Sequence, residues 1–426
     1  MPASAAWYSP KRRGKSGPMT SASTSGLVEG VGEPPLPGPL GRYAATLGRA
    51  IEDSWAARGD HVGVFPQVAA KCLQEVDVPA NLGAAAILRT VAMTRHLVRQ
   101  EDPRGTFGRP PVTLWRSRDF FISALFWFDG TTAIHQHGFS GAFRVLVGGS
   151  IHAPYTFTLE EEITHRLVLG NLQMNGPELL RVGDVRAIEP GNLFIHALFH
   201  LERPSVTLVV RTYNQPTGQP QYNYLRPGVG YDPFYRDDAL ERRLQSVVAL
   251  ADLDPDVGLQ AAFEVVAAED VWVGYLLARR WFAQVDRGDR LQRLLDALPV
   301  RYGEVARPLV AAFDHERRTV SISARRQLLT EPEHRLFLAL LLNLPDRPSI
   351  DEILTQRYPG EHPGSLLSRW VTELASPSQR GISGLIMDET EGVTLAEKLR
   401  TGRAEDLHKV KLGNPPPELL RDLFRT

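Results

Sequence analysis

Two histidines separated by one residue form the strongest chemical signal in the chain. They are His135 and His137, in a short polar segment that runs from residue 132 to residue 138. Because side chains alternate between the two faces of an extended strand, both imidazoles would point to the same side. Imidazole is the commonest side-chain ligand of transition metals in proteins. The spacing therefore predicts a metal site on a strand.

A second pair, His196 and His200, lies in an apolar segment that follows a Pro-Gly turn. A strand returning from such a turn would bring a third imidazole to the first pair. The two residues are four positions apart, so both would face the same side of a strand and alternation does not choose between them. His152 and His165, which lie between the two pairs, are interpreted as structural or solvated.

The elements that hold the first pair are predicted to be β-strands. The apolar run 120–128 ends at Asp129 and Gly130, a pattern typical of a buried strand closed by a turn. The alternating segment 143–147 ends at two glycines, and the segment 151–157 is typical of a returning strand. The first histidine pair therefore lies between strands of an all-β segment.

The two histidine-bearing segments resemble the two sequence motifs of the cupin superfamily. Gly130 precedes the first pair, and Gly149 matches the glycine that closes the first motif. The glutamate of that motif falls on Gly141 or Ala142, neither of which coordinates a metal. The resemblance implies a small double-stranded β-helix barrel over about residues 112–214, with three histidines and no carboxylate in its site.

A three-histidine cupin site is similar to that of cysteine dioxygenase and the other thiol dioxygenases. The spacing of their motifs favours His196 as the third ligand, with His200 as the alternative, and places the family's active-site tyrosine on Tyr213. The resemblance implies an Fe(II) dioxygenase whose partners are O2 and a small-molecule or peptide substrate. Another divalent transition metal stays open, because imidazole ligands alone do not select iron.

Roles are predicted for four further residues, and those of Tyr213 and of the arginines before the barrel are implied by this resemblance. Tyr213 and Arg211 would be catalytic, and Arg116 or Arg118 would bind the substrate, since a guanidinium group pairs well with a carboxylate. The alternative is that Tyr213 is a core tyrosine and that the arginines before the barrel lie on the surface. Two other functions also stay open: a zinc, nickel or manganese cupin enzyme without oxidative chemistry, and a metal-stabilised binding protein.

Composition narrows the class of protein. The chain has 426 residues, 43% of them hydrophobic, a net charge of −1 and one cysteine, Cys72. The near-zero charge gives no electrostatic case for nucleic acid or an anionic membrane, and one cysteine excludes a disulfide within the chain. No apolar run of about eighteen residues is present. We expect a cytoplasmic protein without a membrane partner.

The whole chain is predicted to be an α+β protein, in which helical regions flank the barrel. Apolar residues recur at four-residue steps from Tyr43 to Trp55, which predicts an amphipathic helix before the barrel. The segment 259–282 has the long apolar face of a single helix. The predicted regions are a disordered tail (1–41), N-terminal helices (42–111), the barrel (112–214), a linker or lid followed by helices (215–330) and a C-terminal helical module (331–426).

The last region is similar in pattern to a winged-helix module. Three helices are expected, the second of them capped by Ser349 with Glu352 as a capping box, and a strand is expected at 382–387. The region holds 12 Lys and Arg against 15 Asp and Glu, a net charge of −3 that argues against DNA. The expectation is protein contact, peptide capture or homodimer formation, or a helical subdomain with no recognition role.

Overall fold

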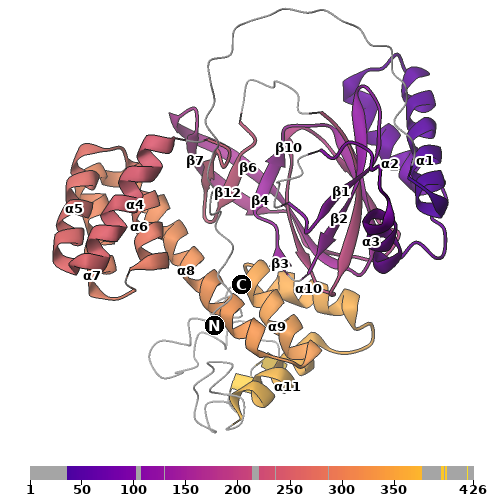
Figure 1. The fold of residues 1–426 in the computed structure, drawn as a ribbon. Coiled ribbons are helices and arrows are strands. Elements are labelled where there is room, and N and C mark those ends of the chain that lie inside the picture. Colours follow the sequence, from indigo (N-terminus) through magenta and orange to yellow (C-terminus); the bar gives the residue numbers. More distant parts are fainter. Residues whose placement is uncertain are drawn as a thin grey trace, which may run out of the picture.

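Two sheets that close into a barrel form the centre of the computed structural model, and helices cover its outer faces (Figure 1). The model describes residues 36–101, 107–128, 130–213, 220–235, 237–285, 287–376, 395–397, 399–400 and 420.

The first sheet has the strand order β1-β2-β11-β5-β9, and the second has the order β3-β10-β4-β12-β13-β7-β6-β8, with β10 also paired to β6. The strands are β1 (Pro111–Arg116), β2 (Phe120–Trp127), β3 (Gly130–Thr131), β4 (Ile134–His137), β5 (Gly141–Val147), β6 (Ser150–Thr164), β7 (Leu167–Met174), β8 (Glu178–Leu180), β9 (Val185–Ile188), β10 (Gly191–His200), β11 (Ser205–Thr212), β12 (Asn223–Leu225) and β13 (Val229–Tyr231).

Strand order identifies the barrel type. Numbering β2, β4, β5, β6, β8, β9, β10 and β11 from one to eight, the first sheet contains 1-8-3-6 and the second contains 2-7-4-5. This is the order of a jelly roll, the double-stranded β-helix in which successive strands, except the fourth and fifth, alternate between facing sheets. The predicted cupin-like barrel flanked by helices is confirmed.

Alternation along β11 shows how the sequence separates the inside of the barrel from the outside. Val206, Leu208 and Val210 are fully buried against the N-terminal helices, whereas Val209 belongs to the core inside the barrel. Arg211 shares the inward parity of Val209. The face that this strand turns to the interior can therefore carry chemistry, while its other face holds the helices.

The N-terminal helices cover the first sheet, as expected. They are α1 (Gly38–Ala56), α2 (Phe65–Glu75) and α3 (Ala84–Met93), with the short 3-10 turn η1 (Val62–Val64) between the first two. Tyr43, Leu47, Ile51 and Trp55 are all buried on one face of α1, which packs against β1. The four-residue spacing in the sequence was the signal for that face.

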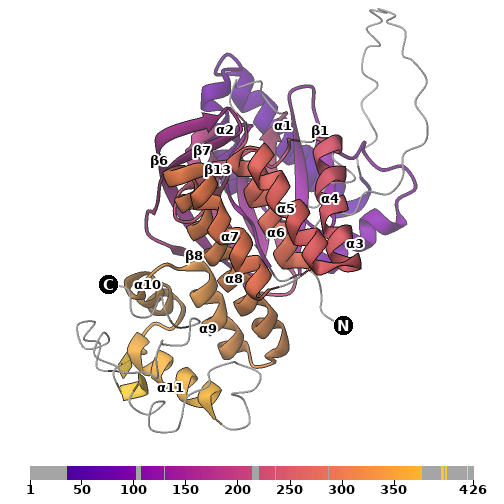
Figure 2. The same ribbon diagram turned by 90° about the vertical axis from the view of Figure 1, so that its left-hand side faces the viewer.

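A bundle of five helices follows the barrel and packs against the far ends of β6, β7 and β13 (Figure 2). The predicted single helix over 259–282 is two helices, because Asp270 caps a new one by accepting a hydrogen bond from the backbone nitrogen of Val273. The helices are α4 (Asp238–Leu253), α5 (Pro255–Ala268), α6 (Val271–Gln284), α7 (Asp289–Tyr302) and α8 (Ala306–Leu328), with the 3-10 turn η2 (Gly303–Val305) before α8.

Three more helices follow, of which α10 packs against β8 of the second sheet: α9 (Pro332–Asn343), α10 (Arg347–Arg357) and α11 (Pro363–Ala375). Their apolar core is continuous with Ile151, Leu179 and Phe199 on the outer face of the barrel. The cap of α10 is Asp346, which accepts from the backbone nitrogen of Ser349, so the predicted cap at Ser349 is wrong by three residues. The expected strand at 382–387 lies outside the described residues.

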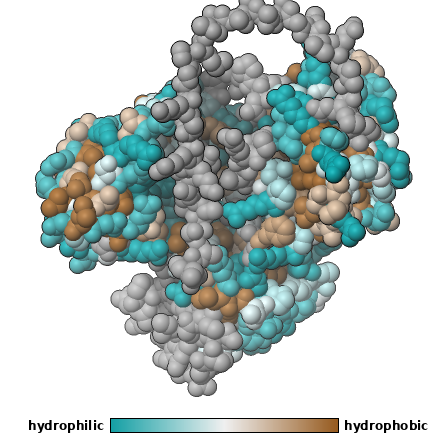
Figure 3. Space-filling view, in the orientation of Figure 1, coloured by the Kyte–Doolittle hydropathy of each residue, from teal (hydrophilic) through white to brown (hydrophobic). Residues whose placement is uncertain are grey.

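The segment after the barrel, expected to be a linker or lid, contributes β12 and β13 to the second sheet. Asn223 pairs with His135 and Tyr224 with Ile134, so β12 lies directly beside β4. Hydrophilic residues predominate on the face of the helical bundle seen in Figure 3, with apolar residues scattered among them. Within the described part of the chain, no helix has the length and apolar character needed to span a bilayer.

Candidate metal centre

Three histidines meet inside the barrel. His135, His137 and His196 each offer a ring nitrogen, and these ligand atoms all lie within 4.8 Å of one another. Their ring centroids are 4.6 to 5.0 Å apart, and all three side chains are buried. The strands β4 and β10 thus bring together three side chains of the kind that hold a divalent transition metal.

The register of β10 against β4 brings the three histidines together. His196 lies opposite His135, and Gly191 lies opposite His137, so five steps along β10 match two along β4. The extra residues form a bulge that starts at Gly191, whose φ of +67° suits glycine. The Pro-Gly signal in the sequence therefore marks an irregularity that places His196 across from the first pair.

Hydrogen bonds orient two of the rings and leave their inner nitrogens free. The Nδ1 of His135 lies 2.8 Å from the carbonyl oxygen of Ala133, while its Nε2 is buried without a hydrogen-bond partner among the described residues. The backbone of Phe194 hydrogen-bonds the ring of His137, whose Nδ1 is likewise buried and unpaired. Buried unpaired nitrogens are costly. A bound metal ion would satisfy both of them, so the donor set fits a metal.

Burial also keeps the three imidazoles neutral. Desolvation lowers the pKa of His135, and it lowers the pKa values of His137 and His196 well below the ordinary range. Repulsion from neighbouring histidines acts in the same direction on the last two. Because a metal binds the neutral imidazole, no proton has to be displaced from the site near neutral pH.

Aromatic rings enclose the cluster. The ring of Phe194 lies 4.6 Å from that of His196, and the ring of Phe139 lies 4.9 Å from that of His137. The rings of Phe107 and Phe143 lie 5.6 Å from His135 and 6.0 Å from His196. The three histidines are themselves buried, and electrostatic interactions are stronger in such a desolvated site than in water.

His200 lies apart from the cluster. Its ring stacks on Trp127 at a centroid distance of 4.5 Å, and its Nδ1 lies 2.9 Å from the hydroxyl oxygen of Ser150. Burial lowers the pKa of His200 to about 3. Of the two candidates for the third ligand, the structure thus brings His196 to the first pair and gives His200 a place in the barrel core.

Arg211 lies beside the cluster. Its guanidinium carbon is 3.8 Å from the ring centroid of Phe139, the ring that also contacts His137. Its positive charge contributes to the low pKa of His137. The site therefore combines three neutral imidazoles with an adjacent cation.

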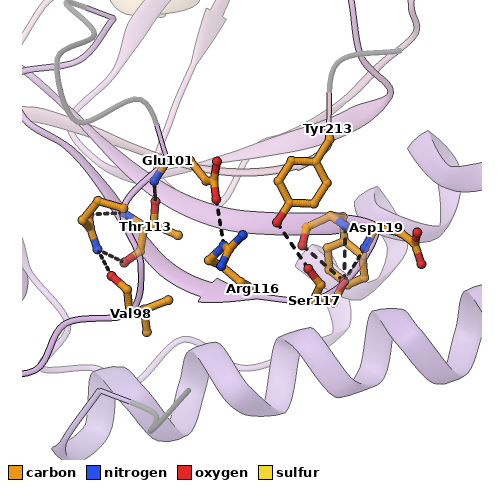
Figure 4. Close-up of polar contacts among 9 residues, drawn as sticks. Val98, Glu101, Thr113, Arg116, Ser117, Asp119 and Tyr213 are labelled. Atoms are coloured by element: carbon orange, nitrogen blue, oxygen red, sulfur yellow. Dashed lines mark hydrogen bonds and ion pairs between the residues drawn. The ribbon is translucent and has the colours of Figure 1, made fainter. Parts of the chain in front are cut away.

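The other residues with predicted roles lie at the β1–β2 end of the barrel (Figure 4). Tyr213 donates its hydroxyl hydrogen to the carbonyl oxygen of Ser117, and its ring packs on Phe121. Arg116 forms an ion pair of 2.8 Å with Glu101, and the side chain of Arg118 is 94% exposed. Arg118 is thus a solvated surface residue in this structure.

Among the polar residues that contact the cluster, His152 was missed by sequence reasoning. His152, expected to be structural or solvated, is buried on β6, and its Nε2 lies 3.0 Å from the Nδ1 of His196. On its other side, its Nδ1 lies 2.7 Å from a carboxylate oxygen of Glu178. The signal that could have found it was the position of His152 on the strand predicted at 151–157.

Comparisons with known proteins give only distant likenesses. No family model matches the sequence, and no curated protein matches it either. Solved structures similar to part of the chain include a cupin-2 domain protein from Shewanella frigidimarina NCIMB 400, with 12% identity over 25% of this chain and 83% of that chain, and a TM-score of 0.17.

Other similar structures are those of enzymes. Hydroquinone 1,2-dioxygenase from Sphingomonas sp. TTNP3, solved with 4-hydroxybenzoate bound, has 11% identity over 28% of this chain and 81% of that chain, and a TM-score of 0.21. Oxalate decarboxylase from Lactobacillus farciminis has 17% identity over 25% of this chain and 28% of that chain, and a TM-score of 0.18. Likenesses this weak carry no argument about activity or substrate. The cupin-like character of the barrel rests on its own strand order and on the three histidines inside it.

Proposed function

We propose that the chain is a metal-dependent oxygenase that acts on an anionic small molecule inside the barrel. The observation that carries this proposal is the set of three buried, neutral imidazoles, two of which have an inner nitrogen without a hydrogen-bond partner among the described residues. His135, His137 and His196 would hold an Fe(II) ion, and the chemistry that this ion would supply is the activation of O2.

The residues of the chain supply binding, orientation and exclusion of water. Arg211 is the cation beside the cluster and binds the anionic group of the substrate. Phe121 packs against both Arg211 and Tyr213, so Tyr213 supports the arginine. The aromatic walls keep the site dry, which makes the attraction between the guanidinium group and an anion stronger than in water.

Metal content tests the proposal. We would measure it by elemental analysis of the purified protein and of His135→Ala, His137→Ala and His196→Ala. The matched control is His200→Ala, because this histidine is equally buried in the same barrel but lies outside the cluster. We expect about one iron per chain, lost in the three variants and kept in the control.

Oxygen consumption then tests the reaction class. The iron-loaded protein is supplied in turn with aminothiols, phenols and aromatic carboxylates, and dissolved O2 is followed with an electrode. Uptake that depends on one substrate and disappears in His196→Ala supports the oxygenase. If the site holds zinc, nickel or manganese and no O2 is consumed, the oxygenase proposal is wrong and a non-oxidative metal enzyme is favoured. If the wild-type protein takes up no metal, a binding protein is favoured.

A further inference from the structure

Three polar side chains cross three neighbouring strands from the cluster to the surface. His196 lies on β10, opposite Pro154 of β6, and His152 lies on β6, opposite Glu178 of β8. The contact from His196 to His152 is 3.0 Å, and the contact from His152 to Glu178 is 2.7 Å. The side chain of His152 is 2% exposed and that of Glu178 is 34% exposed, so the chain of contacts reaches solvent.

The chemistry of the groups decides which one donates each hydrogen bond in the row His196, His152 and Glu178. An ionised carboxylate only accepts, so Glu178 accepts the hydrogen on the Nδ1 of His152. In a neutral imidazole the other nitrogen is then an acceptor, so the Nε2 of His152 accepts from the Nδ1 of His196. His196 is thereby held as the tautomer that carries its free lone pair on Nε2.

Arg186 fixes the outer end of the row. It donates from Nε to one oxygen of Glu178 at 2.8 Å and from Nη2 to the other oxygen. The carboxylate is thus ionised and held in one orientation between β8 and β9.

The three rings of the cluster differ in what orients them. The backbone of Ala133 bonds the ring of His135, and the backbone of Phe194 bonds that of His137. His196 differs from them, because its ring contacts another side chain, that of His152. The orientation of this one ring can therefore be changed by substitution away from the cluster.

We propose that His152 and Glu178 are positioning residues that fix the tautomer and ring orientation of His196 for metal binding. This inference rests on the proposed role of His196 as a metal ligand. Partners of this kind change metal affinity by about 10- to 100-fold when they are removed.

The test is a double-mutant cycle on Co(II) affinity, measured by competition with a chelator on the full chain. His152→Phe removes the acceptor but keeps a ring between Phe143 and Phe194, and Glu178→Gln removes the charge at a partly exposed position. We expect each to weaken Co(II) binding by about 10- to 100-fold. Because both act through one ring, the double variant should bind no more weakly than His152→Phe.

Matched controls remove equivalent groups elsewhere in the barrel. His200→Phe replaces a buried histidine that is bonded to Ser150, and Glu202→Gln replaces a partly exposed carboxylate that is bonded to the backbone of Gly149. Both should bind Co(II) as the wild type does. Unchanged affinity in His152→Phe, or full additivity in the double variant, would overturn the inference.

A readout without metal separates this inference from the proposed function. Nitrogen-15 NMR of histidine-labelled, metal-free protein reports which ring nitrogen carries the hydrogen. We expect His196 with hydrogen on Nδ1 in the wild type and a mixture of tautomers in His152→Phe. Hydrogen on Nε2 in the wild type would refute the positioning role even if metal binds. If the wild type takes up no Co(II), the metal site is refuted. The NMR measurement of the His196 tautomer would still show whether His152 orients that ring.

Discussion

Burial of uncharged histidines is the dominant physical feature at the scale of single residues. Four imidazoles, those of His135, His137, His196 and His200, occupy the barrel with low pKa values caused first by desolvation. In the unfolded chain each would titrate near its ordinary value of about 6.5. In the folded, metal-free protein these imidazoles therefore stay unprotonated at mildly acidic pH. A metal ion that enters the cluster would meet no positive charge on its three histidines.

His200 makes this consequence measurable without touching the cluster. Its folded pKa is about 3 and its ordinary value is 6.5. The folded pKa is depressed, so its contribution to stability is present above pH 6.5 and is lost as pH falls toward 3, because only the unfolded chain takes up the proton. At pH 5 the loss from this residue is about 2 kcal/mol.

Chemical denaturation of the metal-free protein at pH 7.5 and pH 5.0 checks this value. The free energy of unfolding should fall less between the two values in His200→Gln than in the wild type, by about 2 kcal/mol. His165→Gln is the control, because His165 lies in the exposed turn between β6 and β7. An equal fall in His200→Gln and in the wild type would mean that His200 is protonated in the folded barrel.

At the scale of elements, the strand that carries the first histidine pair is supported from both sides. β10 supplies His196 on one side, and β12 lies on the other side. Gln136, the residue between the two histidines, donates to the carbonyl oxygen of Pro220 and accepts from the hydroxyl of Tyr224 at 2.6 Å. The short strand after the barrel therefore stabilises the geometry of β4.

Tyr224→Phe tests this support. The variant leaves the side-chain oxygen of Gln136 buried without its donor, which costs about 1 to 3 kcal/mol. We expect a lower melting temperature and faster Co(II) release, because β4 carries two of the proposed ligands. Tyr222→Phe is the control, since the hydroxyl of Tyr222 bonds the carbonyl of His165, away from β4. Equal Co(II) release rates in the two variants would contradict a special role for β12.

The features that could be predicted from the sequence are those that depend on the residues of a single continuous segment. The spacing of His135 and His137 fixed their common face, and the apolar periodicity of α1 fixed its buried side. The contact of His152 with His196 depends on the register between β6 and β10, which no single segment contains. The strand β12 has three residues in a proline-rich segment, too few for alternation to be visible. The pairing of strands across the sheet could therefore not be predicted from the sequence.

At the scale of the whole molecule, the C-terminal helices bury part of the outer face of the second sheet. Ile151, Leu179 and Phe199 are buried in the core that α9, α10 and α11 form. Hydrogen bonds cross the same boundary: the backbone nitrogen of Leu179 donates to Gln356, and Arg226 donates to the carbonyl oxygen of Asn343. These contacts join the C-terminal helices, for which the sequence predicts a module, to the outer face of the barrel.

Removal of residues 329–426 should therefore expose an apolar face and not release a free domain. Each large apolar side chain that loses its cover forfeits about 1.5 to 3 kcal/mol of burial. We expect the truncated chain to aggregate or to bind a hydrophobic dye, as measured by gel filtration and dye fluorescence against the full chain. A monomeric truncated chain with a sharp melting transition would show instead that the C-terminal region is an independent module.

Gln356→Ala tests the same coupling in the intact chain. Its side-chain oxygen accepts from the backbone nitrogen of Leu179, the neighbour of Glu178 on the short strand β8. Loss of this acceptor should speed hydrogen exchange at the Leu179 amide and, through looser placement of Glu178, weaken Co(II) binding by less than His152→Phe does. Thr355→Ala, an exposed position on the same helix whose hydroxyl bonds only within α10, should change neither. If exchange at Leu179 rises while Co(II) affinity is unchanged, α10 stabilises the edge of the sheet without reaching the metal centre.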